Sequence, residues 1–231
     1  MELIVIGCDG SYPAANGACS GFLVRADDGS TVLLDCGSGV LGKLMALMDP
    51  ANLSAVVITH WHGDHAADLL TLRHYLLIHN KRLPLYAPLD NSLLMQLCEH
   101  EEFVLKASEV GGMMMETTPV VHAMEAFAVK LVCDGKQLVY TGDTDRWENL
   151  ASFCRGADLL VCDATFTSEE WNEQMPHLSS SQAAVLAREA EVKQLLLTHF
   201  PPTGDGVTLL KQAKEVFADC RAAKPGLRIQ V

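Results

Sequence analysis

Four side chains that can bind a metal ion occur within six residues of the sequence, in the segment H-W-H-G-D-H. His60 and His62 are two positions apart, so an extended backbone would point both imidazoles to the same side. Asp64 and His65 are expected at the start of a helix, with Gly63 allowing a tight turn before them. Imidazole and carboxylate groups suit zinc, manganese or iron(II). The spacing therefore predicts a metal site rather than an incidental group of surface histidines.

The elements predicted around this segment would hold it in place. Ala55–Ile58 is a short apolar run typical of a buried strand, and Asp64–His79 has leucines at the spacing of a helix. Further strands are predicted at Leu3–Ile6, Gly21–Val24, Thr31–Leu34, Leu83–Tyr86, Met113–Val121, Ala126–Val132, Gln137–Tyr140, Leu159–Cys162 and Gln194–Leu197. Further helices are predicted at Val40–Met48, Asn91–Cys98, Ser180–Glu191 and Val207–Phe217. Asp-Gly turns within 27–29 and 134–136 indicate hairpins, so the mixture predicts a layered α/β protein with substantial antiparallel sheet.

The bulk composition predicts one soluble domain. The chain has 231 residues, 49% of them hydrophobic, which is enough for one full core, and no linker divides residues 1–231. The N-terminus lacks the features of a signal peptide, and no apolar run approaches the roughly 20 residues that span a bilayer. A cytoplasmic protein is therefore expected. Its eight cysteines include no C-x-x-C pair and are expected to be reduced thiols.

The net charge of −12 makes nucleic acid a less expected partner. Proteins that bind duplexes or tRNA usually carry a basic patch, because neutralising phosphates supplies most of their affinity. Here the Lys and Arg residues number 17 and are dispersed along the chain. A local basic patch would still allow such binding, so the charge makes nucleic-acid binding less expected but does not exclude it.

Five motifs together resemble those of the metallo-β-lactamase superfamily, in the family's order. The segment at 60–65 resembles its H-x-H-x-D-H signature. The other four motifs are Asp35-Cys36-Gly37 after a predicted strand, His122 after another, Gly142-Asp143-Thr144, and His199 at the end of a strand. The resemblance covers nearly the whole chain. It implies an α/β fold of the αββα type, in which two mixed sheets are flanked by helices and the site lies at one edge of the sheets.

The resemblance also implies a two-metal site built from seven side chains. The implied ligands are His60, His62 and His122 for one ion, Asp64, His65 and His199 for the other, and Asp143 as a bridge. The expected cofactors are two divalent ions, zinc first, with manganese and iron(II) as alternatives. Such a pair suits phosphodiester hydrolysis with a bridging hydroxide as nucleophile, and Asp64 is counted among the catalytic residues. Asp35 is expected to orient the ligand loop.

A histidine outside the ligand set indicates the branch of the superfamily. His177, in P-H-L-S-S, resembles the histidine that ribonuclease Z and its cyclic-phosphodiesterase relatives use to protonate the leaving oxygen or contact the phosphate. Ser179 stands where that branch usually has threonine. Asp163, in V-C-D-A-T-F, resembles the acidic residue of a His-Glu-Ala-Thr motif and would orient His177 and stabilise its protonated form. The plain alternative is that Asp163 caps a turn and that His177 is an ordinary loop histidine.

The substrate class is inferred from the spacing of two motifs. Many ribonuclease Z enzymes carry a basic arm between the third-motif histidine and the bridging aspartate. Only 20 residues separate His122 from Asp143, and one predicted hairpin uses them. A small phosphodiester, such as a cyclic nucleotide, is therefore the expected substrate. The family resemblance implies a homodimer, and no membrane is expected as a partner.

Three other interpretations stay open. One is a ribonuclease Z-like RNA-processing nuclease that holds RNA through a dimer partner or another loop. A second is an ester, thioester or lactone hydrolase, which would need neither His177 nor Asp163. A third is a non-catalytic metal-binding protein, against which the intact ligand set argues.

Overall fold

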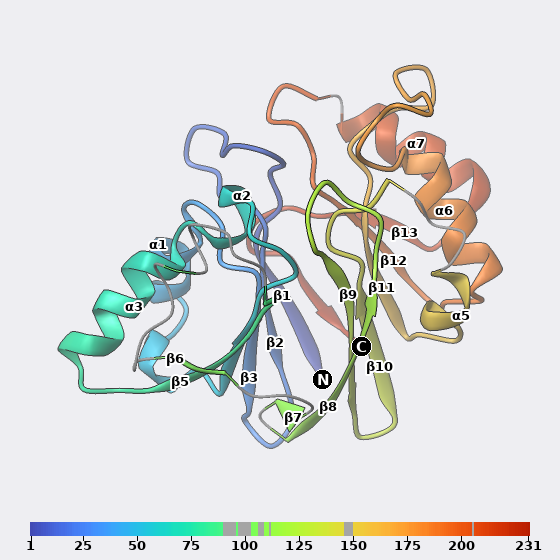
Figure 1. Ribbon diagram of the computed structural model, residues 1–231. Coiled ribbons are helices and arrows are strands. Elements are labelled where there is room, and N and C mark those ends of the chain that lie inside the picture. The colour runs from blue at the N-terminus through green and yellow to red at the C-terminus, as the bar shows by residue number, and fades with distance from the viewer. Residues whose placement is uncertain (90–95, 97–102, 106–108, 111, 146–149, 205) are drawn as a thin grey trace.

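The computed structural model describes residues 1–231 except for 90–95, 97–102, 106–108, 111, 146–149 and 205. Two seven-stranded sheets face each other, and helices cover the outer face of each (Figure 1). This arrangement is the αββα sandwich expected from the sequence. None of the described helices is long and apolar enough to cross a lipid bilayer.

The first sheet has the strand order β14-β1-β2-β3-β4-β5-β6. Its strands are β1 (Glu2–Gly7), β2 (Gly21–Arg25), β3 (Thr31–Leu34), β4 (Ala55–Val57), β5 (Leu83–Tyr86), β6 (Phe103–Leu105) and β14 (Arg228–Gln230). Strands β14 to β3 pair antiparallel, and β3 to β6 pair parallel. The turn predicted between β2 and β3 forms a hairpin, with Gly29 at a φ of 91°.

The second sheet has the order β13-β12-β11-β10-β9-β8-β7. Its strands are β7 (Glu109–Val110), β8 (Met113–Pro119), β9 (Phe127–Cys133), β10 (Lys136–Tyr140), β11 (Leu159–Asp163), β12 (Leu195–Thr198) and β13 (Cys220–Ala222). Strands β7 to β10 pair antiparallel, and β10 to β13 pair parallel. Asp134 and Gly135 both adopt positive φ in the β9–β10 turn, as a tight two-residue hairpin requires.

Alternating side chains build the layers. In β1, Leu3 and Val5 lie in the core between the sheets, whereas Ile4 and Ile6 pack under the helices. This alternation is the two-residue period of a strand buried on both faces. The first sheet is covered by α1 (Val40–Met45), α2 (Gly63–Ala66) and α3 (Leu69–Ile78), together with the 3₁₀ helix Pro50–Asn52. The second is covered by α5 (Ala151–Cys154), α6 (Ser180–Glu189) and α7 (Gly206–Val216).

The single helix predicted at Asp64–His79 is wrong, because two helices occupy this range. The loop around residue 36 forms hydrogen bonds with the backbone groups that would otherwise continue α2. The amide of Asp68 donates to the carbonyl of Cys36, and the amide of Cys36 donates to the carbonyl of His65. The carbonyl of Asp64 accepts instead from the amide of Ser20. Tertiary hydrogen bonds therefore replace the helical ladder between α2 and α3.

Other predicted elements differ from the structure at their limits. The helix predicted at Asn91–Cys98 lies outside the described residues, apart from Gln96. The short strands β6, β7, β13 and β14 and the one-turn helix α5 were not predicted. The seven described cysteines are free thiols, and six of them are buried.

The strand directions bring the candidate site residues to one edge of the sandwich. Strands β3 and β4 run parallel, as do β10, β11 and β12. Strand β8 has the same direction as β10, because both are antiparallel to β9. The carboxyl ends of these strands lie at one edge of each sheet, and the residues that follow them cluster at the same edge of the sandwich.

Candidate metal centre

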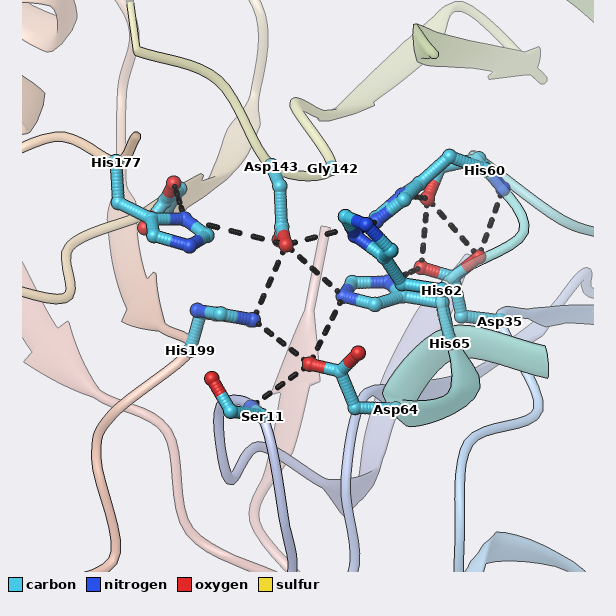
Figure 2. Close-up of polar contacts among 12 residues, drawn as sticks. Ser11, Asp35, His60, His62, Asp64, His65, Gly142, Asp143, His177 and His199 are labelled. Carbon is cyan, nitrogen blue, oxygen red and sulfur yellow. Dashed lines mark hydrogen bonds and ion pairs between the residues drawn. The ribbon is translucent and has the colours of Figure 1, made fainter. Parts of the chain in front are cut away.

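All nine side chains predicted for the site meet at this edge. Figure 2 labels His60, His62, Asp64, His65, Asp143, His177 and His199 among them. They come from both sheets. His60 and His62 follow β4, Asp64 and His65 lie in α2, His122 follows β8, Asp143 follows β10, Asp163 ends β11, His177 precedes α6, and His199 follows β12. The cluster joins segments that are more than 100 residues apart in the chain, as the pair His199 and Asp64 illustrates with a separation of 135.

Three imidazoles form the first half of the cluster. Nδ1 of His62 lies 3.0 Å from Nε2 of His60 and 3.0 Å from Nε2 of His122. Nε2 of His60 also lies 3.6 Å from Oδ2 of Asp143. The backbone at His62 is extended, with φ −65° and ψ 149°, which places His60 and His62 on the same side as predicted.

The second half of the cluster surrounds the Asp143 carboxylate. Oδ2 of Asp143 lies 3.2 Å from Nε2 of His65 and 3.2 Å from Nε2 of His199. Oδ2 of Asp64 lies 3.2 Å from the same nitrogen of His199 and 3.7 Å from that of His65. Asp143 therefore contacts both halves, the position that a bridging ligand would occupy.

Hydrogen bonds on the outer side fix the direction of three rings. Nδ1 of His65 lies 2.7 Å from Oδ2 of the buried Asp35, Nδ1 of His199 lies 3.0 Å from Oγ1 of Thr165, and Nδ1 of His60 lies 3.1 Å from Oγ1 of Thr59. Each ring thereby turns Nε2 towards the cluster, the orientation in which that nitrogen can bind a metal ion.

Asp35 takes the orienting position that the sequence predicts for it. Besides His65, its carboxylate accepts hydrogen bonds from the amide of Thr59 at 2.8 Å and from the Tyr140 hydroxyl at 2.8 Å. Tyr140 ends β10 in the second sheet, while Asp35 follows β3 in the first. The two ligand-bearing edges are therefore tied together beneath the cluster.

The donor set fits divalent metal ions. Ligands 2.0–2.2 Å from a tetrahedral ion lie about 3.3 Å from one another, and the contacts in each half range from 3.0 to 3.7 Å. Among the described residues, Nε2 of His65 and Oδ1 of Asp143 are buried without a hydrogen-bond partner. Burial raises the pKa of Asp143, but His199 and His65 outweigh it and hold that pKa well below its usual range. A buried anionic carboxylate among convergent imidazoles suits a cation.

His177 and Asp163 form a pair beside the cluster. Nδ1 of His177 lies 2.9 Å from Oδ2 of Asp163, and the ring stacks on that of His199 with centroids 4.6 Å apart. Burial lowers the pKa of His177, but the Asp163 carboxylate outweighs it, and the pKa is raised. Asp163 is fully buried and also accepts from Oγ1 of Thr165 at 2.9 Å. The pair has the geometry that the sequence predicts for it.

A pocket of about 500 Å³ opens over these residues. His62, Asp64, Asp143 and His177 line it on one side. The loop of Ser11, Tyr12 and Pro13 lines it on the other side. The amide of Ser11 donates to Oδ2 of Asp64 at 2.7 Å, from a backbone with a positive φ of 64°. Neither this backbone contact nor the roles of Thr59, Thr165 and Tyr140 were predicted from the sequence, although Thr165 lies in the V-C-D-A-T-F motif.

The expectation for Gly63 is wrong, and two other glycines are constrained instead. Gly63 has no positive φ, and a Cβ on it would lie in open space. A Cβ on Gly37 would lie 1.9 Å from the carbonyl oxygen of Asp64. Gly142, next to Asp143, has a φ of 58°, and its Cβ would lie 3.0 Å from that of Thr59. Close packing of the loops needs glycine at these two positions.

Comparison with known proteins identifies the fold and a family. The family model described as a beta-lactamase superfamily domain matches residues 30–200. The chain is 32% identical to the probable metallo-hydrolase YhfI of Bacillus subtilis (strain 168), over 98% of each protein. The crystal structure of the metallo-beta-lactamase fold protein YhfI superposes with a TM-score of 0.93 at 30% identity, covering 99% of this chain and 98% of that one.

Two more distant structures share the fold. The short form of human tRNase Z has a TM-score of 0.80 at 20% identity, covering 100% of this chain and 99% of that one. A diphosphatase from the PhnP family has a TM-score of 0.75 at 20% identity, covering 99% and 96%. At these identities the likeness concerns the fold alone.

Proposed function

Because the chain belongs to the β-lactamase superfamily, we propose that it is a two-metal hydrolase that cleaves small phosphodiesters, cyclic nucleotides among them. The observation that carries this proposal is the His177–Asp163 pair, 2.9 Å apart, beside the His and Asp cluster in one pocket. A thioester hydrolase would not need this pair, because a thiolate leaves without a proton. A phosphodiester with an alkoxide leaving group requires a proton donor there.

The cluster would hold two divalent cations. His60, His62 and His122 would bind one, Asp64, His65 and His199 the other, and Asp143 both. When bound, such a pair supplies Lewis acidity that activates water and stabilises charge on the phosphoryl oxygens. Zinc, manganese and iron(II) all suit this donor set.

His177 would protonate the leaving oxygen. Nδ1 is engaged with Asp163, so Nε2 is the nitrogen that can reach a substrate in the pocket. The Asp163 carboxylate raises the pKa of His177, which favours the protonated form that donates a proton. Asp163 would orient the ring and stabilise its charge, while the carboxylate itself stays buried away from solvent.

The volume of the pocket supports a small substrate. Its volume of about 500 Å³ falls within the range of sites for small molecules. The residues between His122 and Asp143 are taken up by the β9–β10 hairpin, and the chain carries a net charge of −12. A ribonuclease Z-like nuclease is the second candidate, favoured by the fold shared with human tRNase Z.

Turnover of a substrate panel tests the proposal. Protein loaded with zinc or manganese would be given bis(p-nitrophenyl) phosphate, 2′,3′- and 3′,5′-cyclic nucleotides, a precursor tRNA, a thioester and a lactone. We expect hydrolysis of the phosphodiesters with the tRNA intact. Cleavage of the tRNA would favour the nuclease, and activity confined to the thioester or lactone would overturn the proposal.

Substitution of the proposed acid tests the mechanism. We expect His177→Ala to keep its metal content but to lose about 10²–10⁴-fold in the turnover of cyclic nucleotides, the usual scale for a lost general acid. Bis(p-nitrophenyl) phosphate should be much less affected, because p-nitrophenolate leaves without a proton. An unchanged rate with cyclic nucleotides would remove His177 from the mechanism.

A further inference from the structure

The loop that carries His177 is closed at its base but extends well away from the sheet. Phe166 and Ser179 form an isolated bridge, the amide of Phe166 donates to the carbonyl of Leu178, and the amide of Ser180 donates to the carbonyl of Phe166. Residues 167–177 lie between these points, without regular structure, beside α7 (Figure 1). His177 is the last residue before the closure, so its position depends on how this loop is held.

The Trp171 side chain contacts the main chain of His177 directly. The indole Nε1–H donates to the carbonyl oxygen of His177 at 3.1 Å, and the amide of Trp171 donates to the carbonyl of Thr167. Trp171 is half-buried. The two ends of His177 are thus held separately, with the carbonyl on Trp171 and the imidazole on Asp163.

Trp171 is itself part of an anchored segment. Glu170 accepts from both the amide and the hydroxyl of Thr167, which forms the tight turn before Trp171. Gln212 of α7 accepts from the amide of Ser168 at 2.9 Å and donates to Oε2 of Glu169 at 2.6 Å. The indole is therefore attached to α7 through its own loop and acts as a fixed point for His177.

We propose that Trp171 is a positioning residue that holds His177 over the pocket through the indole hydrogen bond. The inference rests on the proposed role of His177 as proton donor. A proton donor must lie within hydrogen-bond reach of the leaving oxygen, and a misplacement of about 1 Å can cost about 10²-fold in rate. The indole hydrogen bond gives the main chain of His177 a second attachment, besides the closure at Leu178 and Ser179.

Leaving-group dependence tests the proposal. The variant Trp171→Phe keeps the ring but removes the N–H donor. Its kcat would be measured on two esters of one nucleotide, the p-nitrophenyl and the methyl phosphodiester. We expect a loss of about 10–100-fold on the methyl ester and a change within about twofold on the p-nitrophenyl ester, with unchanged metal content and melting temperature. Equal losses on both esters would overturn the positioning role.

A double variant shows whether Trp171 acts through His177. If it does, Trp171→Phe combined with His177→Ala should be no slower than His177→Ala alone. Additive losses would contradict the proposal. The matched control is Asn172→Ala, which removes the hydrogen bond from the amide of Gln174, in the same loop but away from His177. It should leave the ratio of the two rates unchanged.

Hydrogen exchange separates this inference from the proposed function. In metal-free protein, the amides of Phe166 and Ser180 close the loop, and we expect both to exchange faster in Trp171→Phe but not in Asn172→Ala. If wild-type protein hydrolysed neither ester, the proposed function would fail, while faster exchange in Trp171→Phe would still support the role of Trp171 in holding His177. Unchanged exchange in Trp171→Phe would overturn that role, whatever the activity.

Discussion

At the scale of single residues, the hydrogen bond at Nδ1 of a histidine determines where its Nε2 points. His60, His65 and His199 bind Thr59, Asp35 and Thr165 through Nδ1, so Nε2 turns to the cluster. His177 binds Asp163 in the same way, but its ring lines the pocket beside the cluster. The same kind of Nδ1 hydrogen bond thus orients both the proposed ligands and the proposed acid. Their roles differ because the ligand rings point into the cluster, whereas the His177 ring lies beside it.

Removal of one central imidazole should abolish the binding of at least one metal ion. His62 contributes the nitrogen that lies 3.0 Å from those of both His60 and His122. We expect His62→Ala to lose at least one metal ion per chain and nearly all hydrolysis, because two ligands and a shared carboxylate bind weakly. Metal analysis of the purified variant is the measurement. His74→Ala, at an exposed position on α3, is the control and should retain full metal content. A full metal complement in His62→Ala would refute the ligand assignment.

At the scale of secondary structure, loops after parallel strands do most of the positioning. The loop after β3 lies against α2 so closely that the amide of Cys36 donates to the carbonyl of His65 at 2.7 Å. Gly37 allows this approach, because any Cβ there would overlap the carbonyl of Asp64. The placement of α2 and its two candidate ligands therefore depends on a glycine from another loop.

We expect Gly37→Ala to weaken both stability and metal binding. Its Cβ would lie 1.9 Å from a backbone oxygen, which only a shift of α2 can relieve, at about 1–3 kcal/mol for an overpacked site. Urea unfolding and chelator competition are the measurements. Gly63→Ala is the matched control within α2, since its Cβ meets nothing within 4 Å. That variant should bind metal normally and unfold within about 1 kcal/mol of wild type. Equal behaviour of the two variants would contradict the explanation.

Asp158 joins three strands of the second sheet. Its carboxylate accepts from the amide of Gln137 at 2.9 Å, in β10, and from the ammonium of Lys193 at 2.7 Å, before β12. Burial raises the pKa of Asp158, but the Lys193 and Gln137 hydrogen bonds outweigh it, so the pKa is lowered on folding. A carboxylate with a lowered pKa stabilises the folded state at pH values above its pKa in the unfolded chain, which is about 4. This contribution is lost as the pH falls through the pKa of the folded state.

Asp158→Asn should therefore be destabilising in a pH-dependent way. We expect a loss of about 1–2 kcal/mol at pH 7, in the range for hydrogen bonds to a charged group, and a smaller loss below about pH 4. Urea unfolding at both pH values measures it. Glu116→Gln serves as the control, because Glu116 forms an ion pair with Lys130 at 3.1 Å with its side chain 57% exposed. That change should stay within about 0.5 kcal/mol. A pH-independent loss in Asp158→Asn would exclude the electrostatic cause.

At the scale of the whole molecule, the candidate site joins the two sheets. His60 and His62 follow a strand of the first sheet, whereas His122 and Asp143 follow strands of the second. Bound cations would therefore connect the two halves of the sandwich and offset part of the net charge of −12. Ions that bind only the folded state stabilise it by mass action.

Metal removal should lower the melting temperature. A ligand at 100 times its Kd contributes about 2.7 kcal/mol, which corresponds to about 5–10 °C for a chain of this size. Scanning calorimetry of chelator-treated protein, before and after zinc or manganese is restored, gives the shift. His62→Ala should show a much smaller change on chelation. An identical melting temperature with and without metal, at confirmed metal contents, would argue against ions that join the sheets.

Much of the fold was predictable because its signals are local. The short apolar runs at Thr31–Leu34 and Leu83–Tyr86 predicted strands at the limits of β3 and β5, and the Asp-Gly turn at 134–135 predicted the β9–β10 hairpin. The family resemblance, confirmed by the fold, named the residues that now meet at one edge. Side-chain type and spacing suffice for these features, because each depends on neighbours only a few positions away.

Tertiary structure alone decided the features that depend on distant partners. The break between α2 and α3 arises because Cys36 and Ser20 take the backbone hydrogen bonds of the helix. Tyr140 reaches Asp35 across 105 residues, and strands as short as β7 and β13 exist only because a neighbour supplies their hydrogen bonds. Such contacts form only once distant parts of the chain have packed together, and no short-range pattern in the chain records them.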